Sequence, residues 1–349
     1  MVISSFFKKI IIFLSIGLFA VNPILVRAET EVFPDATSTT ESSVTSTTAV
    51  GEIVSVPEAV VLARELVPEP LVRVGLYKTN QPVRFKSDFV YEIWNGAELK
   101  GVILAGELVE LSYEKGLYSL KSGSLEFGSK DYFRFVPEDQ NSFFSLENYI
   151  RPVKGRAKIN FNIYRGSLEY RYSPKSKMPF VINELPLEMY MGGIAEVNDG
   201  APAEFIKALS VAARSYAYAM ISKSPPTEKR LFDVYATTAD QLYLGYNSEK
   251  TMPNFVAGTI ATAGELVTYK SNPVITFYFT RSNGKTKSAG ASRPWLRSVE
   301  AKYDKGKAWL GHGLGMSNQD ALQRAKKDGW NYEEILEHYY SDTKVEKVY

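Results

Sequence analysis

Residues 186–221 read PLEMYMGGIAEVNDGAPAEFIKALSVAARSYAYAMI, and this stretch has the pattern of two helices. Proline suits the first turn of a helix, so we expect one helix from Pro186 to about Ala195. Turn residues then interrupt the pattern, and a second, longer helix follows. The stretch therefore predicts two helices joined by a polar elbow, and the elbow carries Glu196.

Glu196 would lie at the C-terminus of the first helix, where the helix dipole opposes an ionised carboxylate by ~0.3–1 kcal/mol. Its neighbours Ile194, Ala195 and Val197 are apolar, so desolvation also favours the protonated form. A general acid that works near neutral pH needs a proton in this way, and we expect any chemistry of the protein here. From its position alone, an exposed elbow glutamate is the commoner interpretation.

The second helix is expected from Ala203 to Ile221, with an apolar stripe and small residues beside it. This pattern predicts a buried helix that another backbone can approach closely. Arg214 lies among the small residues, and an enclosed guanidinium needs a carboxylate or carbonyl partner. Asp233 is the partner that we expect.

Composition excludes several classes of function. The 349 residues include 41 basic and 39 acidic ones, and a net charge of +2 gives no field that favours nucleic acid. The absence of cysteine removes disulfides, thiolate metal sites and cysteine nucleophiles, and with two histidines and no HExxH pattern no metal or other cofactor is expected. Gly284-Lys285-Thr286 is not a nucleotide loop, because Phe279 stands where that motif needs glycine, and no GxSxG elbow is present.

The N-terminus has the pattern of a secretory signal in residues 1–28, with two lysines, an apolar run and the small-residue end Val26-Arg27-Ala28. An uncleaved membrane anchor is the alternative, and both place the folded part outside the cytoplasm. Residues 29–66 are expected to be a disordered tether rich in Ser and Thr, with a short helix in residues 57–66.

Residues 67–180 show short runs with a period of two, which predict antiparallel strands such as residues 72–76, 89–94 and 158–164. Turn dipeptides separate these runs, and they begin at Asn95, Lys115, Ser122 and Arg165. With the helices that follow, the expected fold class is α+β. A β-rich N-terminal region precedes a mixed core over residues 181–349 that holds the two-helix elbow.

Further elements are expected after the two helices. Strands are predicted over residues 231–235, 264–269 and 274–279, and helices over residues 256–262, 318–327 and from 331 to about 340. Ser317 can cap the second of these helices, and Asn331 with Glu334 has the spacing of a capping box for the last one.

Several motifs occur in a particular order around Glu196. They are LPLEMY (185–190), Glu196 itself, KAL (207–209), AARSYA (212–217), FDV (232–234), QLYLG (241–245), SNGKT (282–286) and GHGLGMS (311–317). In this order they resemble the SpoIID/LytB domain family, which includes stage II sporulation protein D, a lytic transglycosylase of peptidoglycan, and amidase-enhancer proteins. The resemblance covers residues 181–345 well and extends more loosely from residue 72.

The resemblance implies that Glu196 is the catalytic acid of an enzyme that cleaves glycan strands after N-acetylmuramic acid and forms a 1,6-anhydro product. Here Val197 and Asn198 replace the usual Met-Pro after that glutamate. Several relatives hold zinc in the segment that matches residues 235–241. This chain has Tyr235, Ala239 and Asp240 there, so no metal is expected.

Polar residues of the matching motifs are expected to position the glycan: Gln241, Tyr243, Ser282, Thr286 and His312. For His312, a loop histidine whose glycine neighbours allow a tight backbone is an equal alternative. The implied partners are peptidoglycan glycan strands and, in a second interpretation, a cell-wall amidase.

That second interpretation is a non-catalytic amidase enhancer or glycan-binding module of the cell wall, which could lose the Glu196 carboxylate without effect. A structural protein attached to the wall is a third possibility, supported only by the tether. We rank the enzyme first.

Overall fold

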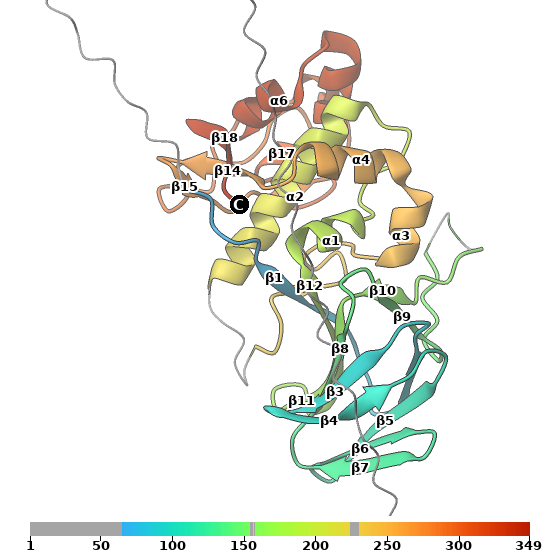
Figure 1. The fold of residues 1–349 in the computed structure, drawn as a ribbon. Coiled ribbons are helices and arrows are strands. Elements are labelled where there is room, and N and C mark those ends of the chain that lie inside the picture. The colour runs from blue at the N-terminus through green and yellow to red at the C-terminus, as the bar shows by residue number, and fades with distance from the viewer. Residues whose placement is uncertain (1–64, 154–155, 157, 224–229) are drawn as a thin grey trace, which may run out of the picture. The chain divides into compact units, whose positions relative to one another are not determined.

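The computed structural model describes residues 65–153, 156, 158–223 and 230–349 (Figure 1). The predicted signal of residues 1–28 lies outside this part of the chain, as do all but two residues of the predicted tether and of the helix expected in residues 57–66. Within the described ranges, no helix has both the length and the apolar character needed to cross a membrane.

Two sheets contain the strands that precede the first helix, together with β13, and most of these strands are labelled in Figure 1. The seven-stranded sheet has the order β13-β1-β12-β11-β8-β3-β4, and the six-stranded sheet has the order β10-β9-β2-β5-β6-β7. The strands are β1 (Leu71–Lys78), β2 (Val83–Lys86), β3 (Tyr91–Asn95), β4 (Glu98–Ile103), β5 (Leu108–Glu114), β6 (Leu117–Ser122), β7 (Leu125–Ser129), β8 (Phe133–Pro137), β9 (Phe143–Leu146), β10 (Ile163–Arg165), β11 (Ser167–Ser173), β12 (Met178–Pro186) and β13 (Val234–Tyr235).

These strands follow the predicted alternation. In β2, Val83 and Phe85 are buried whereas Arg84 and Lys86 are exposed, because successive side chains point to opposite faces of a sheet. The turn at Lys115-Gly116 joins β5 to β6 with both residues at positive φ, 50° and 87°, as a two-residue hairpin turn requires.

The helices and the C-terminal strands form the rest of the described chain. The helical elements are α1 (Leu187–Gly192), α2 (Ala203–Lys223), α3 (Tyr246–Thr251), α4 (Pro253–Ala261), the 3-10 turn η1 (Lys302–Asp304), α5 (Asn318–Gln323), the π-helical turn η2 (Arg324–Asp328) and α6 (Tyr332–Tyr339). A three-stranded sheet has the order β15-β14-β18, from β14 (Glu265–Tyr269), β15 (Asn272–Pro273) and β18 (Thr343–Lys347), and β16 (Tyr278–Phe279) pairs with β17 (Met316–Ser317). The α+β class is confirmed.

Several predicted bounds need correction. Three strands are shorter than predicted: β13 replaces the strand expected over residues 231–235, β16 the one over 274–279, and β10 the one over 158–164. The remaining residues of each range lie in loops, because the regular pairing with a neighbouring strand does not continue through them. Helix α3 was not predicted. Asn331 and Glu334 do form the expected capping box, whereas the hydroxyl of Ser317 makes no cap bond.

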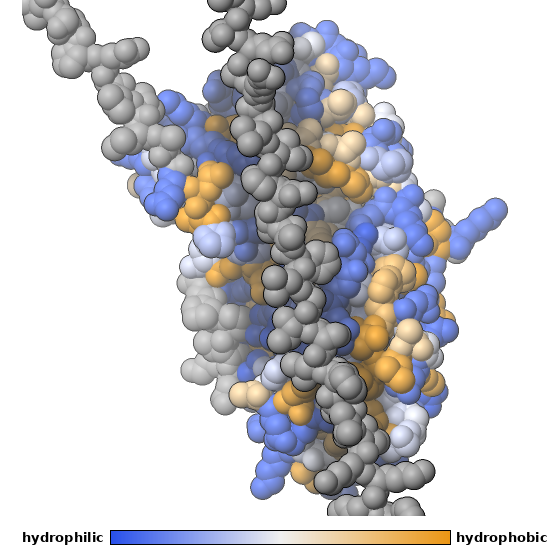
Figure 2. Space-filling view, in the orientation of Figure 1, coloured by the Kyte–Doolittle hydropathy of each residue, from blue (hydrophilic) through white to orange (hydrophobic). Residues whose placement is uncertain are grey.

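One sheet joins the two predicted regions of the chain. Strand β1 pairs antiparallel with β12, directly before α1, and parallel with β13, which follows α2. The main hydrophobic cluster continues from the strands to the helices, and a small second cluster holds Phe180, Ile182, Leu231 and Phe232. The face shown in Figure 2 mixes hydrophilic and hydrophobic residues.

Candidate active site

The elbow that carries Glu196 begins with a single β-bridge between Ile194 and Tyr243, which corrects the predicted helix that continues to about Ala195. Helix α1 ends at Gly192, so Glu196 lies four residues beyond it and not at its C-terminus. The segment pairs instead with residues 242–244: Leu244 N–H donates to the Gly193 carbonyl (2.8 Å) and Ala195 N–H donates to the Leu242 carbonyl (2.9 Å). The dipole of α1 therefore does not explain the state of the carboxyl.

Gly193 allows this close pairing. A Cβ atom at this position would lie 2.4 Å from the ring of Tyr243, which is nearer than side chains tolerate. Tyr243 is itself buried, and its hydroxyl donates to Asn183 Oδ1 over 3.0 Å. The start of the elbow, at Gly193, thus packs directly on the ring of Tyr243.

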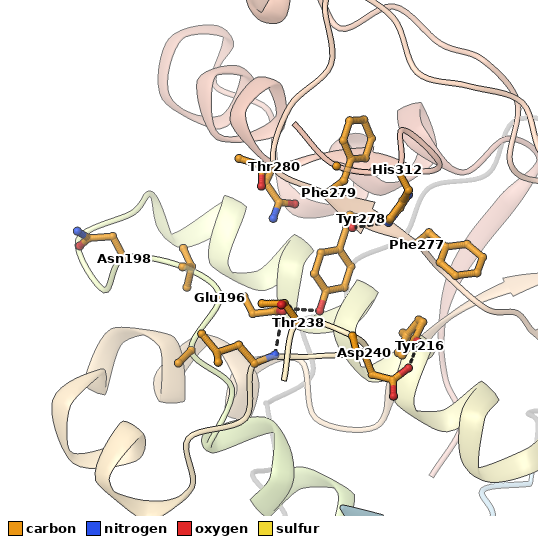
Figure 3. Close-up of a pocket in the computed structure, with 16 residues that line it drawn as sticks. Glu196, Asn198, Tyr216, Thr238, Asp240, Phe277, Tyr278, Phe279, Thr280 and His312 are labelled. Carbon is orange, nitrogen blue, oxygen red and sulfur yellow. Dashed lines mark hydrogen bonds between the residues drawn. The ribbon is translucent and has the colours of Figure 1, made fainter. Parts of the chain in front are cut away.

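Each oxygen of the Glu196 carboxyl accepts one hydrogen bond. Leu242 N–H donates to Oε1 over 3.0 Å, and the hydroxyl of Tyr278 donates to Oε2. Figure 3 shows the phenol of Tyr278 pointing at the carboxyl from the opposite wall of the pocket. Residues from three separate segments therefore meet at this carboxyl.

Gln241 fixes the direction of the bond from Tyr278. Its Nε2 donates to the Ala213 carbonyl (3.0 Å) and to the Tyr278 oxygen (2.9 Å), while its Oε1 accepts from the hydroxyl of Tyr190 (2.9 Å). Because the Tyr278 oxygen already accepts from Gln241, its own proton is directed to Glu196. Gln241 is fully buried and holds the hydroxyl of Tyr278 in position.

Burial raises the pKa of Glu196 above its ordinary value, while the hydrogen bonds from Tyr278 and Leu242 act in the opposite direction. Burial and the nearby Glu196 charge raise the pKa of Tyr278 well above its ordinary value, so this hydroxyl stays a donor. The site thus holds a carboxyl with increased proton affinity, and two donors are ready to stabilise it once the proton has left.

A pocket of about 650 Å³ opens over Glu196. Aromatic rings of Tyr216, Phe277 and Phe279 line it, together with residues of the elbow and of the segment around Asp240 (Figure 3). The oxygens of Asp240 are both engaged, by the Tyr216 hydroxyl (2.5 Å) and by Tyr235 N–H (2.8 Å). Of the two carboxyl groups that line the pocket, Asp240 is held by two donors from the protein, and Glu196 is the one that burial disposes to hold a proton.

His312 also lines the pocket. Its Nε2 lies 3.1 Å from the carbonyl of Tyr278, and its Nδ1 accepts from Leu314 N–H over 3.1 Å, which assigns the neutral ring with its proton on Nε2. Burial lowers the pKa of His312, the hydrogen bond to the Tyr278 carbonyl acts in the opposite direction, and the charge of Lys287 lowers the pKa further. Both ring nitrogens form hydrogen bonds to backbone groups, and the imidazole therefore stabilises β16, the strand that contains Tyr278.

The other predicted positioning residues do not line the pocket. Ser282 is buried and donates from both its N–H and its hydroxyl to Asp304 Oδ2 (2.8 and 3.1 Å), to which Ser317 also donates (2.5 Å). Thr286 accepts from Val299 N–H over 3.0 Å. Together with Tyr243, these residues hold the loops around the pocket in place, because buried polar groups need such partners.

The expected pair of Arg214 and Asp233 is wrong. The fully buried Arg214 binds Glu188 through two bonds, Nε to Oε1 (2.8 Å) and Nη2 to Oε2 (2.9 Å). Asp233 accepts from Arg73 N–H over 2.9 Å. Glu188 reaches Arg214 because α1 packs directly against α2.

Sequence reasoning missed Tyr278, Asp240 and the N–H of Leu242 as members of the site. Tyr278 was assigned only to a strand, yet a hydroxyl in the otherwise apolar run VITFYF was a signal that this position has a polar partner. Asp240 was noted only where relatives carry zinc ligands. No group of three or more histidine, aspartate or glutamate side chains is placed to hold a metal ion in the part of the chain that the structure describes.

Comparison with known proteins matches residues 175–269 to the family described as SpoIID, stage II sporulation protein. An uncharacterized protein of Brachyspira hyodysenteriae is 34% identical over 142 residues, which are 39% of this chain and 37% of that protein. The stage II sporulation protein D of Bacillus subtilis is 28% identical over 142 residues, and that of Bacillus amyloliquefaciens is 32% identical over 146; each match covers 36% of this chain and 41% of the relative.

The chain thus matches about two fifths of the length of these curated relatives. The family match contains Glu196, Gln241 and Asp240 and ends before Tyr278 and His312. The predicted resemblance to the SpoIID family is confirmed over residues 175–269.

Proposed function

We propose, from the premise that this chain carries a SpoIID-family domain, that it remodels the cell wall by cleaving peptidoglycan glycan strands after N-acetylmuramic acid, as a lytic transglycosylase. The observation that carries the proposal is Glu196. It is a carboxyl of raised pKa at the base of an aromatic-lined pocket, with a donor on each oxygen. A secreted or envelope location is part of the proposal and is supported by the signal-like pattern of residues 1–28.

One carboxyl can serve both halves of the proposed reaction. The protonated Glu196 gives its proton to the glycosidic oxygen, and the bond from that oxygen to C1 of the muramyl sugar breaks. The 6-hydroxyl of the same sugar then bonds to C1 and gives its proton back to Glu196. Because the nucleophile belongs to the substrate, no second carboxyl is needed to activate water.

The residues around Glu196 suit this cycle. The bonds from Tyr278 and Leu242 favour the carboxylate that exists between the two proton transfers, whereas burial favours the acid that begins and ends the cycle. The aromatic side chains of the pocket offer flat apolar surfaces to sugar rings, and the hydroxyl of Tyr216 is held by Asp240.

Glu196→Gln tests the assignment. The amide keeps the shape and can still accept from Leu242 N–H, but it cannot donate a proton of suitable acidity. We expect the release of 1,6-anhydro-muramyl products from purified glycan strands to fall by at least about 100-fold, which is the usual contribution of a general acid. Mass spectrometry of the digest measures the product, and circular dichroism checks that the fold is kept.

Glu337→Gln is the matched control, because Glu337 is an exposed carboxyl on α6 away from the pocket. It should digest as the parent does. Equal anhydro product from Glu196→Gln and parent would refute the role of Glu196. A parent that releases none, but increases the activity of an added cell-wall amidase, would favour the enhancer interpretation.

A further inference from the structure

A second hollow, of about 1000 Å³, adjoins the candidate active site. Ala239 and Asp240 line both hollows, so the two meet at this segment. The second hollow, which we call the aromatic groove, runs between β1, the turn before β12 and residues 230–240. A chain molecule bound in the pocket can therefore continue into the groove without leaving the protein surface.

Tyr235 presents an exposed ring in the groove. Its side chain is 45% exposed, although the residues on both sides of it, Val234 and Ala236, are buried. The ring meets Phe232 edge to face at a centroid distance of 4.7 Å, and its backbone N–H donates to Asp240 Oδ2 over 2.8 Å. An aromatic ring held this way in the open loses little conformational freedom on binding, which is a property of recognition surfaces and not of a core.

A stacked pair of rings also lines the groove. Tyr77 and Tyr149 lie parallel, with centroids 4.1 Å apart and an angle of 3° between their planes. Flat aromatic surfaces suit the apolar faces of sugar rings. The groove thus offers a saccharide more than one platform.

Among the described residues that line the groove, three side chains are basic and two are acidic. Lys78 and Lys175 are exposed and form no ion pair with another described residue, whereas the carboxylates of Asp233 and Asp240 accept hydrogen bonds from backbone N–H groups. The guanidinium of Arg230 donates to the carbonyls of Met220 and Asp233. A ligand with carboxylate substituents would complement the two lysines.

We infer that the aromatic groove binds a further length of the same saccharide strand that occupies the candidate pocket. The strand is one that carries carboxylates, which face Lys78 and Lys175, while its sugar rings lie on Tyr235. The ligand class rests on the proposed function. The groove sets how strongly long strands bind, and not the chemistry at Glu196.

Binding is measured in a Glu196→Gln parent, so that no substrate is consumed. The probes are a disaccharide of N-acetylglucosamine, its neutral hexamer, and long glycan strands of alternating N-acetylglucosamine and carboxylate-bearing N-acetylmuramic acid. In the parent, affinity should rise steeply from the disaccharide to both longer ligands. Adding Tyr235→Ala should weaken both longer ligands about tenfold and leave the disaccharide unchanged, while Tyr235→Phe should bind as the parent does.

The lysines are tested by the double change Lys78→Gln and Lys175→Gln. It should weaken only the carboxylate-bearing strand, and the loss should shrink in high salt because exposed charges are screened. Leu117→Ala is the control: it removes an apolar side chain of similar exposure, 50%, from the six-stranded sheet and should change no affinity.

Three results would overturn the inference. The first is long-strand affinity that is equal in Tyr235→Ala and parent, and the second is an equal effect of the lysine changes on neutral and charged ligands. The third is a parent whose affinity does not rise with ligand length. Each can occur whether or not the wild-type protein cleaves strands, so the groove and the role of Glu196 are judged separately.

Discussion

Glu196 accepts from two donors that respond differently to substitution. The N–H of Leu242 belongs to the backbone and is kept by the pairing of the elbow with residues 242–244. The hydroxyl of Tyr278 is a side-chain group whose direction depends on Gln241. The proton affinity of Glu196 is therefore adjustable through Tyr278 without moving the elbow.

Tyr278→Phe removes that donor and should raise the pKa of Glu196 further, because the bond from Tyr278 favours the ionised carboxyl. Under the proposed mechanism the acid form then persists to higher pH. We expect the alkaline limb of the pH profile of kcat/KM to move upward by about one pH unit, which matches one hydrogen bond to a charged group. The rate of anhydro product release measured from pH 4 to 9 checks this.

Tyr340→Phe is the control for Tyr278→Phe. Tyr340 is a buried tyrosine whose hydroxyl donates to the Phe277 carbonyl over 2.9 Å and does not reach Glu196. Its removal should lower stability and leave the alkaline limb in place. An alkaline limb that stays fixed in Tyr278→Phe, or moves to lower pH, would contradict the role given to Tyr278.

At the level of elements, α1 and α2 are joined by an ion pair whose arginine is fully buried and whose glutamate side chain is 25% exposed. Glu188 lies in the first turn of α1, and both its oxygens bind Arg214 of α2. The same carboxylate accepts from Gly264 N–H (2.9 Å) and from the hydroxyl of Tyr349 (2.8 Å). One carboxylate thus connects two helices, the residue before β14 and Tyr349.

Arg214→Ala should lower the free energy of unfolding by about 3–5 kcal/mol. The change leaves Glu188 without its main partner and opens a cavity in the core, and removal of one member of a buried pair has this typical effect. Arg214→Lys should recover only part of the loss, because an ammonium group cannot form the two parallel bonds. Urea denaturation followed by circular dichroism gives the values.

The exposed pair of Arg297 and Asp342 provides the comparison. Their side chains are 56% and 60% exposed, and exposed ion pairs contribute less than about 1 kcal/mol. Arg297→Ala should therefore be nearly neutral. If Arg214→Ala lowers the free energy of unfolding as little as Arg297→Ala does, the pair of Arg214 and Glu188 is unimportant for stability.

The whole described chain depends on a sheet whose strands come from distant parts of the sequence. Strand β12 spans the predicted boundary between residues 180 and 181, and β1 lies between β12 and β13. The β-rich region and the helical region share this sheet and a continuous core. They are expected to fold as one cooperative unit.

Expression of residues 67–180 and 181–349 as separate chains tests this. The cut removes most of β12 from its neighbours β1 and β11, so we expect neither piece alone to show dispersed amide signals in NMR or a cooperative thermal transition. A chain of residues 65–349 is the control and should unfold in one transition. Cooperative unfolding of the isolated 67–180 piece would show that the sheet is not shared in the way described.

The amino-acid sequence by itself determined what depends on neighbours a few residues apart. The hairpin turn at Lys115-Gly116, the extent of α2 and the capping box at Asn331 follow from local dihedral preferences and short-range hydrogen bonds, and each was predicted. The special position of Glu196 was also predicted, although its raised pKa comes from burial and not from a helix end.

Tertiary structure alone decided which distant groups meet. Tyr278 lies 82 residues from Glu196, Glu188 replaces Asp233 as the partner of Arg214, and Ser282 turns inward to Asp304. No local pattern encodes these contacts, because they depend on how helices and strands pack and on which buried polar groups can satisfy one another. Folding buries the carboxyl of Glu196 in the wall of a pocket, and this burial raises its pKa.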